Sequence, residues 1–328
     1  MDDNSPRYID DVDSEISIEE EILKEKISKI ALVQCGSVIF NIKETMEKVE
    51  TYTEEASKNG CDMIIFPEAF IGGHPKGLSF DFNYSINDNR NEFKKYFDSS
   101  IEYGSYECNI LKNIALKYNI LLIIGVVERD GCTLYSSMFF YSPSSGRIGR
   151  SRKLMPATYE KIVWSRGDGS DVNVFDTKIG KIGCVLSWDS YMPLMRCAMY
   201  HKGVEIYLTP TVDDSETWIN LIKTIAIEGR CYVLSVSQYL TTSNFPENHI
   251  TRENKEKKLI RGGSCVINPL GEVLLSPSYD KETIFYVSID LNDIVKGKFD
   301  LDTTGHFSRP DIFKLIVNEN KINGYLKE

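Results

Sequence analysis

The sequence has few of the residues that build metal and disulfide sites. Only four histidines occur among its 328 residues, and no two of them stand at a metal-ligand spacing. None of the eight cysteines forms a C-x-x-C pair. Several cysteines, such as Cys35 and Cys231, lie in apolar segments, where a thiol behaves as a small hydrophobic group. These absences argue against a zinc site and favour reduced thiols in a cytoplasmic setting over disulfides.

Long hydrophobic runs and basic stripes are absent as well. The longest apolar run, Ile120 to Val127, suits a buried strand and is too short to span a bilayer. The acidic N-terminus has no apolar core segment, so we expect no secretory signal. Residues 1–26 carry ten acidic and three basic side chains, which places most of the net charge of −10 there. We therefore expect a disordered acidic tail over residues 1–27, and neither a membrane nor a nucleic acid as partner.

Strand-like and helix-like segments alternate along the rest of the chain. Ile42, Met46 and Val49 recur at near-helical spacing and predict an amphipathic helix over residues 41–58. Residues 71–90 are rich in Gly, Asn, Asp and Ser and predict a long loop. Further strands are predicted over residues 28–35, 62–66, 120–127, 133–142, 172–176, 181–186, 204–210, 231–237, 263–268, 272–275 and 283–289, and further helices over residues 105–119, 192–201 and 215–229. This order predicts an α/β protein with two sheets packed face to face and helices outside.

Three charged residues, two of them after predicted strands and one in the segment YEKIVW (159–164), are candidates for chemistry. Glu68 follows a short apolar strand, where partial desolvation suits a carboxylate to act as a base near neutral pH. Lys153 follows a hairpin strand and could stabilise developing negative charge. Glu160 could orient that lysine through a charge-assisted hydrogen bond. Taken singly, each of the three is more often a solvated surface residue.

Ser187 begins the loop after the predicted strand 181–186. It is not part of a G-x-S-x-G elbow, and His201, fourteen residues downstream, gives no clear triad. On spacing alone, Ser187 is a structural serine at the end of a strand.

Five segments, taken together and in this order, resemble those of the nitrilase family in the carbon–nitrogen hydrolase superfamily. They are FPEAFIGGHPKG (66–77), RKLMPATYEKIVWSRGDG (152–169), KIGCVLSWDSYMPL (181–194), RGGSCVINPLG (261–271) and DTTGHFSRPD (302–311). The last segment is typical of nitrilases rather than of amidase relatives. The resemblance implies a four-layer α-β-β-α sandwich, a catalytic domain over residues 28–298 and a C-terminal interface tail over residues 299–328.

The resemblance also implies a catalytic set of Glu, Lys and Cys. This set falls on Glu68, Lys153 and Ser187, with Glu160 as the second glutamate, so serine stands where the family has cysteine. An alcohol is a far weaker acid than a thiol, and a glutamate is a poor base for it. We expect this serine to lower the rate by about 10³-fold or more, or roughly 4 kcal/mol of barrier. The serine fits either an introduced substitution or a non-hydrolysing relative, and the three retained residues favour the first.

The resemblance further implies which residues bind substrate. The expected pocket residues are Trp188, Tyr191, His74, Trp164 and Thr211. Among them His74 stands where the family commonly has tyrosine.

The implied activity is hydrolysis of a nitrile to a carboxylic acid and ammonia, with no cofactor or metal, in a form nearly silenced at its nucleophile. The alternatives are a non-catalytic binding or scaffold protein of the same fold, and an amidase. The resemblance implies dimers that pair through a helical face and often extend into spiral filaments. We expect deletion of residues 299–328 to change the sedimentation profile.

Overall fold

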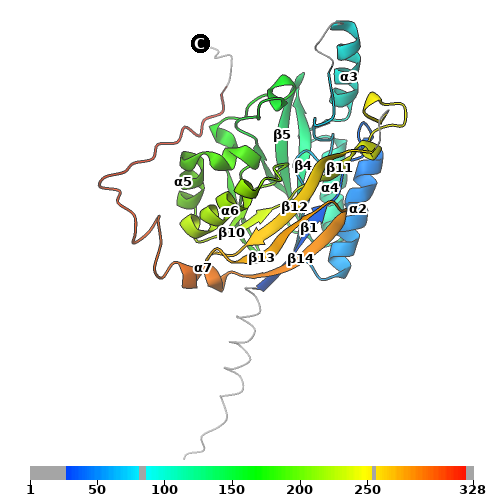
Figure 1. The fold of residues 1–328 in the computed structure, drawn as a ribbon. Helices are drawn as coiled ribbons and strands as arrows, with labels where there is room; N and C mark the ends of the chain where they lie inside the picture. The colour runs from blue at the N-terminus through cyan, green and yellow to red at the C-terminus, as the bar shows by residue number, and fades with distance from the viewer. Residues whose placement is uncertain (1–26, 81–85, 253–255, 323–328) are drawn as a thin grey trace, which may run out of the picture.

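Two mixed β-sheets pack face to face at the centre of the molecule, and helices cover their outer faces (Figure 1). The computed structural model describes residues 27–80, 86–252 and 256–322, so the predicted acidic tail lies almost entirely outside the described residues. The first sheet contains, in spatial order, β14 (Thr283–Asp290), β1 (Ile27–Gln34), β2 (Met63–Ile65), β4 (Leu121–Asp130), β5 (Thr133–Ser142) and β6 (Gly146–Arg152), with β3 (Ile101–Glu102) beside β4. The second contains β11 (Tyr239–Thr241), β12 (Lys258–Ile267), β10 (Tyr232–Ser235), β9 (Ile206–Leu208), β8 (Gly180–Cys184) and β7 (Val174–Thr177), with β13 (Val273–Tyr279) beside β12.

Strand β1 shows how the sequence builds the layers. Its side chains alternate between the two faces of the sheet, as the period of two requires. Ala31 and Val33 join an apolar cluster with α2 and α4, whereas Ile30 and Leu32 join the cluster between the two sheets. The helices are α2 (Ile42–Lys58), α3 (Ile86–Asp98), α4 (Tyr106–Lys117), α5 (Pro193–His201), α6 (Glu216–Gly229) and α7 (Asn292–Gly297).

A third apolar cluster joins α5 and α6 to the outer face of the second sheet, and it includes Met199 and Ile222. The order of layers is therefore α2 and α4, first sheet, second sheet, α5 and α6. This confirms the predicted four-layer α-β-β-α sandwich.

The prediction of one long loop over residues 71–90 is wrong at its end, because α3 begins at Ile86. The Asn and Asp residues that open α3 are typical of loops, and the helix is fixed by a tertiary contact that no local pattern encodes. Its buried Tyr96 donates a hydrogen bond to the carbonyl oxygen of Gly73 at 2.9 Å. The short elements β11 and α7 were not predicted either, since three and six residues carry too little periodic signal.

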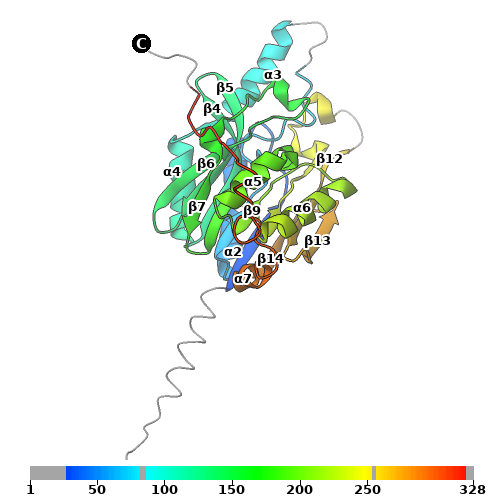
Figure 2. The same cartoon turned by 90° about the vertical axis from the view of Figure 1, so that its left-hand side faces the viewer.

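The C-terminal part of the described chain, which includes Leu315 and Glu319, runs across the outer face of α5 (Figure 2). An ion pair of 2.7 Å between Lys202 and Glu319 ties the segment to the helix end. Beneath it lies an apolar groove of 490 Å³, whose lining includes Met195 and Leu315.

All eight cysteines are free thiols. Across the described residues, every helix is too short or too polar to cross a membrane. The cytoplasmic location stays a prediction.

Candidate active site

The predicted catalytic residues follow the ends of strands or lie in nearby turns. Glu68 follows β2, Lys153 follows β6 and Ser187 follows β8, while Glu160 begins a short 3₁₀ helix. All four side chains are buried, at 3% exposure or less. Burying charged groups is costly unless they are paired, so the arrangement of their partners decides what this site can do.

Lys153 lies between two carboxylates. Its Nζ donates to Glu68 Oε1 at 2.9 Å and to Glu160 Oε2 at 2.7 Å. Burial disfavours the charged lysine, but the two carboxylates outweigh this effect and raise the pKa of Lys153. The site therefore holds a permanent ammonium with its charge confined between two acids.

Glu160 is the most completely hydrogen-bonded acid of the site. Besides Lys153, its Oε2 accepts from the backbone N–H of Ala157 at 2.6 Å, and its Oε1 lies 3.2 Å from His74 Nε2. Burial opposes ionisation of Glu160, but the hydrogen bond from His74 and the charge of Lys153 prevail and lower its pKa to about 2. This carboxylate is therefore a fixed anion.

Glu68 keeps one oxygen free of partners. Its Oε1 accepts from Ser136 Oγ at 2.8 Å and from Lys153, whereas its buried Oε2 has no hydrogen-bond partner in the described part of the chain. Buried polar atoms are nearly always paired, and an exception calls for an explanation. A role of Glu68 as proton acceptor, from the nucleophile or from water, would explain the unpaired oxygen.

The backbone around Glu68 is held in an unusual path. The next residue, Ala69, has φ of 51°, in the left-handed region. A side chain at Gly125 of β4 would lie 2.0 Å from the Pro67 carbonyl oxygen, so only glycine lets the Glu68 loop pass this close. Gln238 Nε2 donates to the Glu68 carbonyl oxygen at 2.8 Å and ties the loop to the second sheet.

Ser187 is held in a strained conformation. Its φ of 49° is uncommon for a residue with a side chain and costs on the order of 1 kcal/mol or more. Its N–H donates to the Pro210 carbonyl oxygen at 2.8 Å, and its Oγ lies 3.1 Å from Thr211 Oγ1. Strained backbone of this kind clusters at functional sites, which makes position 187 a candidate for a reacting group.

Asp189 joins the Ser187 turn to the lysine segment. Its buried carboxylate accepts from the N–H groups of Leu154 and Met155, at 2.6 and 3.0 Å. Burial raises the pKa of Asp189 to about 7, against these backbone hydrogen bonds and the charge of Lys153, which lower it. This clamp fixes Ser187 relative to Lys153.

The nearby Cys184 does not replace the missing thiol. It lies in the core between the two sheets, and burial raises the pKa of its thiol well above the ordinary value, with Glu68 adding to the effect. A thiol in this environment is inert.

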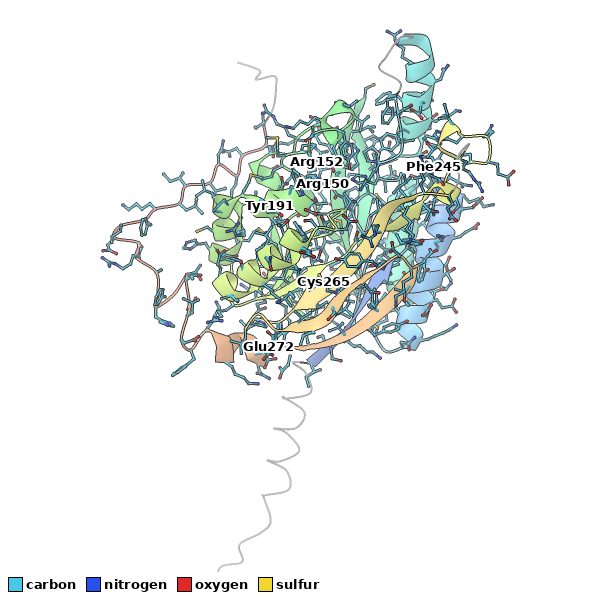
Figure 3. The ribbon with its side chains drawn as sticks, viewed as in Figure 1. Arg150, Arg152, Tyr191, Phe245, Cys265 and Glu272 are labelled. Carbon is cyan, nitrogen blue, oxygen red and sulfur yellow. The ribbon has the colours of Figure 1, made fainter. Side chains whose placement is uncertain are left out.

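The predicted binding residues fall into an exposed and a buried group. Trp188 and Tyr191 are half-exposed and meet edge to face, with ring centroids 6.1 Å apart; Tyr191 is labelled in Figure 3. Thr211, Trp164 and His74 are buried. The two exposed rings lie beside the nucleophile position.

Glu68, His74 and Glu160 place ligand atoms within 4.8 Å of one another, a spacing that can hold a metal ion. Lys153 Nζ already lies between the two carboxylates. His74 Nδ1 accepts from the Lys76 N–H at 3.2 Å, so both ring nitrogens are engaged. The two carboxylates are already paired with the Lys153 ammonium, and Glu160 also with His74. The three residues therefore suit these pairings rather than a metal ion.

Sequence reasoning missed several residues that shape the site. Ser136 and Gln238 both bind the Glu68 segment, and Tyr96 supports the His74 segment. Asp189 could have been found, because an acid two residues after Ser187 occupies a predicted site segment. The other three lie in β5, in α3 and between β10 and β11, away from the predicted site segments in the sequence, and no local pattern marks them.

Comparison with known proteins identifies the chain's relatives. The carbon–nitrogen hydrolase family model matches residues 29–299. An aliphatic nitrilase from Sinorhizobium fredii is 43% identical over 296 residues, covering 89% of this chain and 96% of the relative. Nitrilase 2 from Arabidopsis thaliana is 40% identical over 303 residues, covering 90% and 89%. A bifunctional nitrilase/nitrile hydratase from Lupinus angustifolius is 39% identical, covering 90% and 87%.

Solved structures show the same fold. The carbon–nitrogen hydrolase from Helicobacter pylori superposes with a TM-score of 0.67 at 22% identity, covering 87% of this chain and 97% of that one. The Saccharomyces cerevisiae Nit3 protein, a member of branch 10 of the nitrilase superfamily, gives a TM-score of 0.65 at 22% identity, covering 86% and 97%.

Proposed function

The chain belongs to the carbon–nitrogen hydrolase family, in its nitrilase branch, and on this premise we propose that Glu68, Lys153, Glu160 and position 187 form its catalytic site. The reaction is hydrolysis of a nitrile to a carboxylic acid and ammonia. The observation that carries the proposal is the buried Lys153 between two carboxylates, one of which keeps an unpaired oxygen. The names of the relatives support nitriles over amides as substrates.

In the proposed reaction, a nucleophile at position 187 attacks the nitrile carbon and loses its proton to Glu68 Oε2. Lys153 donates a hydrogen bond to the nitrile nitrogen as negative charge develops there. A thiol nucleophile gives a thioimidate. Water then adds to the thioimidate carbon, the nitrogen of the former nitrile leaves as ammonia, and a thioester remains. A second water releases the carboxylic acid and restores the thiol, so two waters are consumed for each nitrile.

Serine at position 187 slows the first step in this proposal. A glutamate can assist ionisation of a thiol with a pKa near 8.5 but is a poor base for an alcohol. The rest of the site needs no change, because the clamp by Asp189 and the hydrogen bond from the N–H of residue 187 to the Pro210 carbonyl oxygen hold the backbone there. In this proposal the chain carries a nitrilase site that is nearly inactive because oxygen stands in place of sulfur in the side chain at position 187.

The first test is ammonia release from a panel of nitriles and matching amides by the chain and by Ser187→Cys. We expect the cysteine form to exceed the serine form by about 10³-fold or more on nitriles. A Ser187→Cys/Lys153→Met double variant is the matched control and should return to the serine level. Activity of neither form would favour the non-catalytic binding protein, and activity on amides alone would favour the amidase.

We also propose that residues 299–328 form the interface tail between subunits. Its described part exposes large apolar side chains, including Phe299 at 88%, Phe313 at 77% and Ile316 at 92% exposure, which a monomer rarely leaves in water. Leu194 of the adjacent α5 is 70% exposed as well. Deletion of residues 299–328 should change the sedimentation profile, and an unchanged particle size would remove the interface role.

A further inference from the structure

His74 is fully buried and lies directly behind the catalytic cluster. Its Nδ1 accepts a hydrogen bond from the Lys76 N–H, so the proton of the neutral ring is on Nε2. That N–H donates to Glu160 Oε1 at 3.2 Å. The ring therefore has one defined tautomer and one defined target, and it has no nitrogen left for a substrate.

The segment that carries His74 is fixed from several sides. Tyr96 donates to the Gly73 carbonyl oxygen at 2.9 Å, and Thr251 Oγ1 donates to the Gly77 carbonyl oxygen at 2.7 Å. The His74 ring meets the Trp164 ring edge to face, with centroids 5.3 Å apart and an interplanar angle of 88°. The imidazole is therefore held by its surroundings and can orient Glu160 rather than follow it.

We propose that His74 is a positioning residue that acts on the reaction through Glu160 and Lys153 and does not contact the substrate. The inference rests on the proposed function for its effect on turnover. Glu160 has one oxygen for Lys153 and one for His74. Loss of the histidine donor leaves Glu160 Oε1 buried without a partner, which favours a turn of the carboxylate away from Lys153. The ammonium then shifts toward Glu68, and the free oxygen of Glu68 loses its alignment with position 187.

The test uses three substitutions in the Ser187→Cys background. Glutamine places its amide nitrogen where Nε2 stands, so His74→Gln keeps the donor to Glu160. Asparagine places its amide nitrogen nearer Nδ1, and phenylalanine has no donor. The matched control is His249, whose Nδ1 accepts from the Thr251 N–H and whose Nε2 lies 3.1 Å from Glu92 Oε1. The same three substitutions at His249 test the identical local geometry outside the site.

The first readout needs no substrate. The alkylation rate of the introduced thiol by iodoacetamide, followed peptide by peptide by mass spectrometry, reports its ionisation and access. We expect His74→Phe and His74→Asn to lower this rate by about 10-fold and His74→Gln to stay within about 3-fold of the parent, because donor geometry alone separates these variants. All three His249 variants should stay within about 3-fold of the parent rate, because the Thr251 Oγ1 hydrogen bond to Gly77 does not use the histidine.

The second readout is nitrile turnover. His74→Phe should lower kcat by about 100-fold and leave KM within about 3-fold, since it acts on alignment rather than on binding. Equal losses in His74→Gln and His74→Phe, or a rise in KM alone, would overturn the positioning role. If alkylation follows the expected order while no variant hydrolyses a nitrile, the positioning role stands and the proposed function fails. Thermal melts of each variant exclude simple unfolding.

Discussion

Two His–Glu pairs in this molecule share a local design and differ in what surrounds them. In the site pair, His74 lies 3.2 Å from Glu160, and in the rim pair, His249 lies 3.1 Å from Glu92. In both, Nδ1 accepts from the N–H two residues along the chain. The side chains of the site pair are 0% and 2% exposed, and those of the rim pair are 12% and 17% exposed.

The difference lies in the second oxygen of each glutamate. Glu160 uses it to hold Lys153, whereas Glu92 uses it to accept from the Phe80 N–H at 2.6 Å. The rim pair lies in the loop region of Phe245, which is labelled in Figure 3, and the His249 ring packs against that ring with centroids 4.9 Å apart and a tilt of 36°. The same histidine turn therefore contacts a buried cluster of charges in one place and links chain segments in the other.

The largest expected difference between the pairs is in activity. In the Ser187→Cys background, Glu160→Gln should lower kcat/KM by about 10³-fold, or about 4 kcal/mol, because it removes one of the two charges that hold Lys153. Glu92→Gln keeps one acceptor oxygen and loses the other, but Glu92 makes no contact with Lys153, so kcat/KM should stay within about 3-fold. Steady-state kinetics on a hydrolysed nitrile measures both, and similar losses in the two variants would break the distinction.

A smaller effect is expected on the free energy of unfolding in acid, where Glu160→Gln and the parent protein should differ. The pKa of Glu160 is lowered from 4.5 to about 2, so its contribution to folding is complete above about pH 4.5 and is lost as the pH falls toward 2. The contribution is on the order of 3 kcal/mol at neutral pH. Urea unfolding at pH 6 and pH 3 should show a smaller acid loss in Glu160→Gln than in the parent. Parallel losses in the two proteins would contradict the assignment.

The smallest effect is expected at the rim. His249→Phe removes a partly exposed pair and its backbone contact, and it should lower the free energy of unfolding by about 1 kcal/mol or less. Thermal melting measures this loss. The alkylation rate of a thiol introduced by Ser187→Cys should not change, and a change there would show that the rim pair also acts on the site.

The sequence predicted the layers better than it predicted the contacts. β5 was predicted with its observed ends, because an apolar segment between turn signals defines a strand locally. The positions of Glu68, Lys153 and Ser187 at strand ends could be inferred in the same way. The hydrogen bond from Ser136 to Glu68 spans 68 residues of sequence, and no periodicity encodes which loops meet at that distance. The tautomer of His74 could not be predicted, because it depends on a single backbone N–H.

The ammonium of Lys153 is paired with two carboxylates, so the cluster has an excess of negative charge. This excess has a consequence for the end of a catalytic cycle. A nitrile enters without charge, but the proposed product is an anion formed beside the carboxylates of Glu68 and Glu160, in a place with little water to screen the charges. Repulsion should then drive the acid out, whereas the neutral amide of the same shape would stay longer. Inhibition constants for such a matched acid and amide, measured on Ser187→Cys, should favour the amide. The excess of negative charge around Lys153 would therefore also promote release of the product.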